Sequence, residues 1–290
     1  MTDIGGRTYF VTGCSHGIGF ELVVELLKQN YRVAATSRNK KSLIEKLKEY
    51  SPSLVNDRFL PIEMNLLSES SIKGAIHEVI KKFGSIYCVI NNSGYGQAGT
   101  VEELCEKEVR ENFDVNVFGL INVIKHALPN LREMHYPDPR IICISSIAGY
   151  NGQFPGFPIY IATKFAVDGF CESLSKDLEE FNIKVTSVLP GYVRTDFLSS
   201  SSLHVPKHPI PEYKAVRHVI ETHTKEINQK QQGDPVLCAK AIVEVSVMQD
   251  PPLHFFLGKD AVQFAEAKIE SMKQQINKFR DLSCSTDFKN

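Results

Sequence analysis

The chain has 290 residues, and 33 Lys and Arg against 34 Asp and Glu give it a formal net charge of −1. Hydrophobic residues make up 42% of the chain and charged residues 23%, which is ordinary for a folded globular protein. These values exclude general disorder. They also disfavour a nucleic-acid or membrane-surface partner, because the chain supplies neither a basic face nor a polybasic tail.

The seven cysteines are scattered along the chain, with no CxxC pair among them. Zinc sites and disulfide frameworks need close, repeated spacings, so we expect reduced thiols and no metal-ligating residues. Residues 1–13 lack the charged and then apolar pattern of a signal segment. No apolar run approaches the ~20 residues that cross a bilayer. We therefore expect a cytoplasmic protein without a membrane span.

Short β-rich runs alternate with amphipathic runs along the chain. Several of the β-rich runs are continuously apolar, which is typical of parallel strands covered on both faces. This alternation predicts an α/β fold in one domain, with a doubly wound parallel sheet of about seven strands in a three-layer α/β/α arrangement. The expected strands are Thr8–Thr12, Arg32–Ser37, Phe59–Asn65, Ile86–Asn91, Arg140–Ser146, Lys184–Leu189 and His254–Gly258.

The segment Ser199–Gly233 interrupts this alternation. It begins with four serines, contains three prolines and continues as a polar helix rich in Lys and Gln. Its place after the sixth strand puts it over the carboxyl edge of the sheet, where a substrate lid would lie. A solvated surface loop is the alternative.

The first strand runs into the glycine-rich sequence Thr12–Gly19 and then into a helix. In an open α/β sheet a pyrophosphate binds at this first turn, against exposed amides of the helix N-terminus. Gly13 would permit the tight turn, Gly17 the close approach of a ligand, and Gly19 the packing of helix on strand. Ser15, His16 and Ile18 complete the predicted loop. Three purely structural glycines are the alternative interpretation.

The end of the second strand predicts which dinucleotide binds. An acid here would hold a free ribose 2′-hydroxyl, but the chain has Ser37 followed by Arg38. A hydroxyl and a guanidinium favour a 2′-phosphate, and His16 can add a second donor on that side. We therefore expect NADP(H) in preference to NAD(H), unless Arg38 merely caps a solvated strand end.

Tyr160 and Lys164 are spaced i and i+4 in a helical segment, so their side chains share a face. A neighbouring cation lowers the pKa of a phenol and makes it a proton donor and acceptor. A serine pair, Ser145 and Ser146, ends the fifth expected strand, and Asn116 is polar among apolar neighbours.

Taken in order, these motifs resemble the short-chain dehydrogenase/reductase family. The pattern comprises TGxxxGxG, the NNSG of Asn91–Gly94, Asn116, Ser145-Ser146, YxxxK and the PGYVRT of Pro190–Thr195. It covers about residues 5–198. The resemblance implies a Rossmann fold and NAD(P)-dependent oxidoreduction. The HFFLGKDA sequence near residue 260 is similar to the retinol and 17β-hydroxysteroid dehydrogenase branch, which implies an apolar alcohol or carbonyl substrate.

The resemblance also implies roles for individual residues. Tyr160 would be the acid/base, Lys164 would lower its pKa and bind the nicotinamide ribose, and Ser146 would hold the substrate oxygen. Asn116 would hold a water that links the lysine to solvent. The remaining implied cofactor contacts are Asn65, Leu66, Asn92, Gly94, Pro190, Gly191, Val193 and Thr195.

Two departures from the family pattern bear on these roles. Tyr160 follows Ser146 by 14 positions, one more than is common in the family, so either Ser145 or Ser146 could be catalytic. We predict Ser146 from the SSxAG pattern. Asn65 stands where the family usually carries an aspartate for the adenine, and its amide can still pair with a base edge.

The sequence therefore predicts an NADP(H)-dependent oxidoreductase that interconverts a secondary alcohol and a ketone or aldehyde. The alternative is a catalytically silent NADP-binding regulatory or scaffold protein. An epimerase or dehydratase on the same fold is disfavoured by the glycine spacing. Apolar residues lie on more than one face of the helices around Asn112–Leu131 and Phe157–Phe181. The resemblance implies that this helix pair forms the interface of a homodimer or homotetramer, and ordinary burial under neighbouring helices is the alternative.

Overall fold

The computed structural model describes residues 6–133 and 135–288. The first five residues, where the sequence predicts no signal segment, lie outside this range. Among the described residues, seven parallel strands form one sheet in the spatial order β3-β2-β1-β4-β6-β7-β9. These strands are β1 (Thr8–Val11), β2 (Arg32–Ser37), β3 (Phe59–Glu63), β4 (Cys88–Asn91), β6 (Arg140–Ile144), β7 (Lys184–Pro190) and β9 (His254–Leu257).

All seven predicted strands are present, within one or two residues of the predicted ends. β4 and β6 are buried along their whole length, as their apolar sequences CVIN and RIICI predict for strands covered on both faces. Two further strands, β5 (Gly96–Gln97) and β8 (Leu203–His204), pair with each other as a separate parallel ribbon. The sequence did not predict this ribbon, because two residues are too few for any periodicity.

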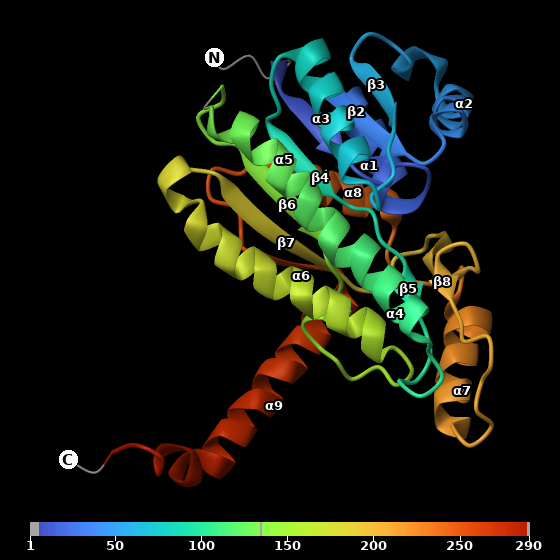
Figure 1. Ribbon diagram of the computed structural model, residues 1–290, viewed down its shortest axis with the longest axis vertical. Coiled ribbons are helices and arrows are strands. Elements are labelled where there is room, and N and C mark those ends of the chain that lie inside the picture. The colour runs from blue at the N-terminus through green and yellow to red at the C-terminus, as the bar shows by residue number, and fades with distance from the viewer. Residues whose placement is uncertain (1–5, 134, 289–290) are drawn as a thin grey trace.

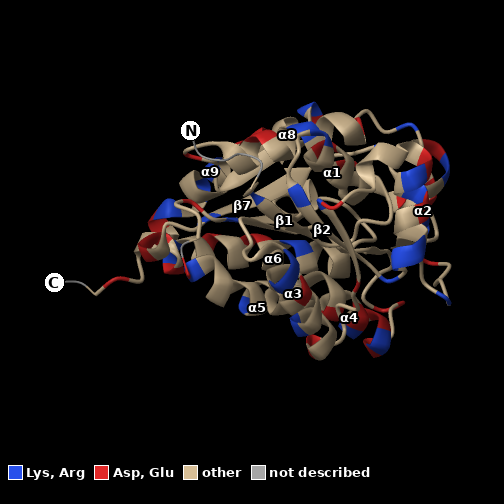
Figure 2. Cartoon of the chain, turned by 90° about the horizontal axis from the view of Figure 1, so that it is seen from above, with Lys and Arg blue, Asp and Glu red and all other residues tan. Residues whose placement is uncertain are grey.

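Helices cover both faces of the sheet and make the predicted three layers (Figures 1 and 2). One hydrophobic core joins α1 and α8 to the sheet, and the other joins α3, α5 and α6 to its opposite face. The helices are α1 (Gly17–Lys28), α2 (Lys40–Tyr50), α3 (Glu69–Phe83), α4 (Glu106–Phe113), α5 (Leu120–Arg132), α6 (Pro158–Asp177), α7 (Lys214–Glu221), α8 (Pro235–Val247) and α9 (Lys259–Cys284).

Short helical turns connect several of these elements. The segment between α4 and α5 is a π-helical turn that contains Asn116, so the predicted helix around this residue is present but locally widened. A second π-helical turn follows α7. These turns are η2 (Pro52–Leu54), η3 (Asp114–Gly119), η4 (Ile147–Gly149), η5 (Glu179–Phe181), η6 (Asp196–Leu198) and η7 (Thr222–Ile227).

Residues 199–233 contain β8, α7 and η7, and they lie beside β5 and α4 (Figure 1). The expectation of a polar helix here is wrong in one respect. Ile220 of α7 is buried, and Val216 and Val219 pack on the same small core as Phe157. α7 is therefore amphipathic, and its apolar side packs against Phe157, which lines the cleft described below.

The candidate active site lies in a cleft at the strand ends

A cavity of about 560 Å³ opens at the carboxyl ends of the parallel strands. It lies where the strand order reverses, between β1 and β4, which is the usual ligand position in such sheets. Apart from Gly19 and Asn116, every predicted site residue lines it. These are Gly13, Ser15, His16, Gly17, Ile18, Ser37, Arg38, Asn65, Leu66, Asn92, Gly94, Ser146, Tyr160, Lys164, Pro190, Gly191, Val193 and Thr195.

The glycine loop has the backbone geometry that the sequence predicts. Gly13 and Gly17 have φ angles of +71° and +58°, in the left-handed region that favours glycine. Gly19 lies beneath the loop, where a Cβ would collide with the Gly13 carbonyl and the Asn92 amide group. The Asn92 amide nitrogen donates to the carbonyl of Gly13 at 3.0 Å and so holds the turn in place.

This loop fits the pyrophosphate of a dinucleotide. α1 begins at Gly17, and the preceding His16 makes no side-chain hydrogen bond to cap its first turn. The first-turn amides and the positive end of the helix dipole therefore face the cavity at Gly17 and Ile18. A Cβ on Gly17 would lie 3.3 Å from the Thr195 side chain, so there is little space between the loop and Thr195.

The end of β2 forms the next part of the cavity wall. Ser37 is buried, and its hydroxyl shares a 2.8 Å hydrogen bond with that of Ser15, while Arg38 is exposed at the rim. His16 lies 3.3 Å from the Ser202 hydroxyl. Burial, and then the positive charge of Lys46, lowers the pKa of His16, so the ring is neutral at neutral pH and keeps a single N–H donor.

Lys46 is a cation that the sequence reasoning missed. It comes from α2, and its ammonium donates to the Ser15 carbonyl at 3.1 Å. Lys46 is 31 positions from Ser15, and no sequence pattern links the two. Only the folded structure brings α2 next to the glycine loop.

The two serines after β6 point in different directions. The Ser146 side chain lies close enough to Tyr160 to lower the pKa of its phenol, and the Ser146 hydroxyl accepts the Ala148 amide at 3.1 Å. The Ser145 hydroxyl instead donates to the main-chain carbonyl of Lys164 at 3.2 Å. The geometry therefore brings Ser146, and not Ser145, to the phenol.

Tyr160 and Lys164 are both buried on α6, one turn apart. The Lys164 ammonium donates to the Ile144 carbonyl at 2.9 Å and lies 5.9 Å from the centre of the Tyr160 ring. Burial lowers the pKa of Lys164 to about 8.

The expectation that this cation lowers the pKa of Tyr160 is wrong for the cleft as it stands. Burial raises the pKa of Tyr160 to about 12, and only the neighbouring Ser146 side chain acts in the other direction. The physical reason is that the ammonium is directed at the Ile144 carbonyl rather than at the phenol oxygen, while the ring is removed from water. The phenol is therefore fully protonated at neutral pH.

Asn116 lies behind Tyr160 and Lys164 rather than in the cavity wall. Its amide nitrogen donates to the Tyr95 carbonyl at 3.0 Å and to the Thr163 hydroxyl at 3.1 Å, and its oxygen accepts the Tyr95 amide at 3.0 Å. The side chain thus joins the segment after β4 to α6. Its predicted role in holding a water stays a prediction.

The far end of the cavity is mainly aromatic. Four aromatic residues line it: Phe154, Phe157, Tyr192 and Phe197. His223 of η7 was not predicted, and its Nε2 atom lies 2.8 Å from the Tyr192 hydroxyl. This pair is a polar position within an otherwise apolar wall.

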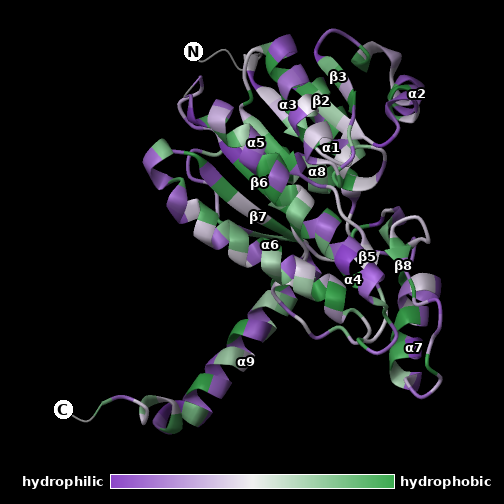
Figure 3. Ribbon diagram, in the orientation of Figure 1, coloured by the Kyte–Doolittle hydropathy of each residue, from purple (hydrophilic) through white to green (hydrophobic). Residues whose placement is uncertain are grey.

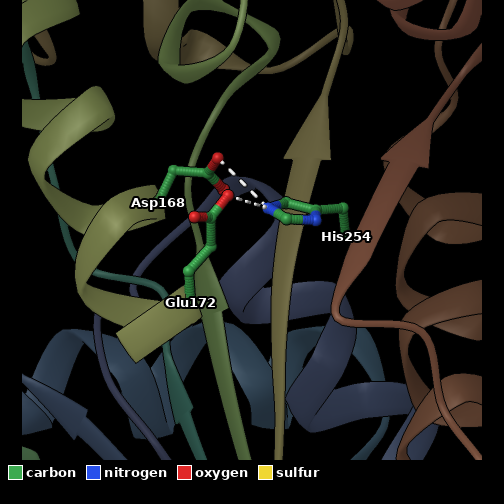
Figure 4. A group of neighbouring side chains, drawn as sticks. All are labelled: Asp168, Glu172 and His254. Carbon is green, nitrogen blue, oxygen red and sulfur yellow. Dashed lines mark ion pairs between the residues drawn. The ribbon is translucent and has the colours of Figure 1, made fainter. Parts of the chain in front are cut away.

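The sequence predicts no metal ligands, but one group of side chains outside the cleft has the spacing of a possible metal site. Among the described residues, Asp168 and Glu172 of α6 and His254 of β9 lie close enough together to ligate an ion (Figure 4). The His254 Nε2 atom is 3.3 Å from a carboxylate oxygen of each acid. We interpret the group as a contact that attaches the edge strand to α6, because the His254 ring faces both carboxylates and needs no ion to do so.

Comparisons with known proteins agree with this geometry. A family model described as short chain dehydrogenase matches residues 7–205. The chain belongs to the short-chain dehydrogenase family of oxidoreductases, which bind a nicotinamide cofactor. Within the residues described, no helix is both long and apolar enough to cross a membrane.

Three relatives illustrate the similarity. "Oxidoreductase BOA17" of Botryotinia fuckeliana is 29% identical over 280 residues, which is 97% of this chain and 99% of that protein. "Retinol dehydrogenase 8" of Bos taurus is 30% identical over 85% of this chain and 80% of its own length. The crystal structure of a short-chain dehydrogenase from Streptomyces avermitilis superposes with a TM-score of 0.86 at 30% identity, covering 97% of this chain and 99% of the other.

Proposed function

We propose that the protein is an NADP(H)-dependent oxidoreductase that interconverts a secondary alcohol and a ketone or aldehyde, with Tyr160 as the acid/base. The observation that carries this proposal is that Tyr160 and Ser146 line one cavity together with the glycine loop and the aromatic wall, with Ser146 near enough to lower the pKa of the phenol. A bound nicotinamide would supply the hydride.

The cofactor site is assigned by the donors that line it. The first-turn amides of α1 would bind the pyrophosphate, and Ser37 with Arg38 would bind a 2′-phosphate. Arg38 supports NADP(H) because it attracts the 2′-phosphate, whereas an acid at this position would repel it. Lys46 adds positive charge on the same side of the loop.

The proton step follows from the protonation state of the cleft. A phenol with a pKa of about 12 is a proton donor at neutral pH, so the arrangement favours carbonyl reduction. Ser146 would hold the carbonyl oxygen, and Tyr160 would donate its proton to that oxygen as the alcohol forms. Lys164 would then pass a proton toward the phenolate, for which a lysine pKa of about 8 is well matched.

The substrate would be a small apolar alcohol or carbonyl compound. We propose that the aromatic wall binds its apolar part and that residues 199–233 are a substrate lid on a single oxidoreductase domain formed by the whole chain. The retinol dehydrogenase relative supports a substrate of this class. We further propose a cytoplasmic homodimer or homotetramer that assembles through the helices around Asn112–Leu131 and Phe157–Phe181.

The proposal is tested by following cofactor oxidation with a panel of apolar ketones and aldehydes, using NADPH and NADH in parallel. We expect turnover with a lower KM for NADPH. Arg38→Ala should raise the KM for NADPH by roughly tenfold and leave that for NADH unchanged, because one charge-assisted phosphate contact is lost.

Lys40→Ala, two residues further along the same exposed segment, is the matched control. Binding of NADPH without turnover of any carbonyl would support a silent dinucleotide-binding protein instead. A KM for NADH equal to or lower than that for NADPH would contradict the cofactor assignment.

A further inference from the structure

The last helix, α9, leaves the body of the molecule. It has 26 residues, but its buried side chains are confined to its first turns, at Ala261 and Ala265. From there it extends away from the sheet and the other helices (Figure 1). An isolated helix is only marginally stable in water, since most helical stability in proteins comes from packing of an apolar face. The outer part of α9 therefore needs a partner.

This outer part carries an apolar stripe. Ile269, Met272, Ile276 and Phe279 are spaced by three, four and three residues, which places them on one side of the helix. Their exposed fractions are 54%, 42%, 55% and 50%, so the body of the protein does not cover them. Figure 3 shows hydrophobic and hydrophilic positions alternating along the projecting helix.

The spacing is that of a coiled-coil seam. With Ile269 and Ile276 at a positions, Met272 and Phe279 fall at d positions, and an a/d seam packs against a second helix. The flanking e positions hold Glu266, Lys273 and Arg280. These charges set the orientation of the partner helix.

A second copy of α9 is complementary to the first when it runs antiparallel. A two-fold axis near Lys273 brings the a and d residues into reciprocal layers, with Ile269 beside Phe279 of the second copy. The same axis places Glu266 beside Arg280 of the second copy, and this ion pair occurs twice. The opposing Lys273 side chains are the unfavourable pair, and both are exposed enough to extend into water.

A parallel pair fits the charges less well. It would place Lys268 of one helix beside Lys273 of the other on both sides of the seam, without the pairing of Glu266 and Arg280. Charge complementarity therefore favours the antiparallel arrangement.

We propose that residues 266–282 of α9 form an antiparallel two-helix contact with the same segment of a second copy of this chain. The contact is isologous, so by itself it closes as a dimer and does not propagate. It lies on a different element from α5 and α6 and is separate from the contact proposed there.

The test measures particle mass by light scattering on the full chain over a range of concentrations. Ile276→Asp should halve the mass of the wild-type particle, because a charge enters the seam. Glu266→Arg and Arg280→Glu should each raise the dissociation constant by roughly tenfold, because two ion pairs become two repulsions. Combining both changes should restore the wild-type value.

This rescue is specific to the antiparallel contact. Residues 266 and 280 are about 21 Å apart within one helix, so they cannot compensate in the same molecule. Glu270→Arg, on the outward face, is the control and should leave the mass unchanged. Circular dichroism of each variant checks that α9 remains helical.

Three outcomes would overturn the proposal. The first is an unchanged mass for Ile276→Asp in a chain that remains folded. The second is a double charge reversal that stays as weak as the single ones. The third is sedimentation of the wild-type chain with phosphatidylserine vesicles that Ile276→Asp abolishes at unchanged mass, because the stripe would then cover a lipid surface.

Discussion

Ser145 and Ser146 are neighbours in the sequence, yet they contact different groups. Successive side chains point to opposite sides of an extended backbone. The end of β6 therefore directs Ser146 to the phenol of Tyr160 and Ser145 to the main-chain carbonyl of Lys164. In the proposed function Ser146 acts on a substrate oxygen, whereas Ser145 stabilises the helix that carries Tyr160.

Exchanging each serine for alanine separates these two roles. Ser146→Ala should lower kcat by about 10²-fold, within the range that a lost group of an acid–base site costs. Ser145→Ala should keep most of the activity and lose about 1 kcal/mol of stability, the usual contribution of one buried hydrogen bond. The measurements are steady-state kinetics and urea unfolding, and a larger kcat loss for Ser145→Ala would reverse the assignment.

The site residues could be predicted from spacing, but their protonation could not. Gly13, Gly17, Tyr160 and Lys164 are recognised from the strand, turn and helix in which they lie. The pKa of Tyr160 depends on how much water the folded cleft excludes and on the direction of the Lys164 ammonium. Neither quantity is present in an i, i+4 spacing, so the prediction of a lowered pKa was wrong.

At the scale of elements, a buried ion pair holds residues 199–233 over the cleft. The Glu103 carboxylate has no exposed surface and receives the Arg217 guanidinium at 2.6 Å. It also accepts the amides of Thr100 and Ile210, each at 2.8 Å. These contacts attach α7 and the chain before it to the segment that follows β5.

Glu103→Gln should loosen this attachment, because a neutral amide cannot replace a carboxylate that accepts three donors. Each hydrogen bond to a charged group contributes about 1.5–3 kcal/mol to stability. We expect faster proteolytic cleavage within residues 199–233 and a higher KM for the carbonyl substrate, at unchanged affinity for NADPH.

Glu102→Gln is the matched control, since Glu102 is exposed and contacts only the Tyr213 hydroxyl among the interactions described. Equal cleavage rates for the two variants and the wild type would show that the ion pair does not hold residues 199–233 in place.

The sequence predicted the position of this segment but not its anchoring. Glu103 and Arg217 are 114 positions apart, and no local pattern links them. The strands β5 and β8 have two residues each, which is too short for a periodic pattern to predict them. The apolar side of α7 spans only two turns and is equally hard to recognise from the sequence. Contacts of this kind form only when the complete fold brings distant segments together.

At the scale of the whole molecule, the alternation of strands and helices was sufficient to predict the parallel sheet and its two helical layers. The reversal of strand order between β1 and β4 then places the glycine loop, the end of β6 and α6 around one cavity. The outward course of α9 was not predicted. An apolar stripe has the same spacing whether it covers the protein's own core or a second molecule.

The central claim is that Tyr160 transfers the proton to the carbonyl oxygen. The most direct test is the rate of NADPH oxidation by Tyr160→Phe with the best ketone of the panel, measured together with the Kd for NADPH. We predict a rate at least about 10²-fold below wild type, as expected for loss of a general acid, with the Kd unchanged within about threefold. A variant that binds NADPH normally and retains more than about half of the wild-type rate would contradict this claim.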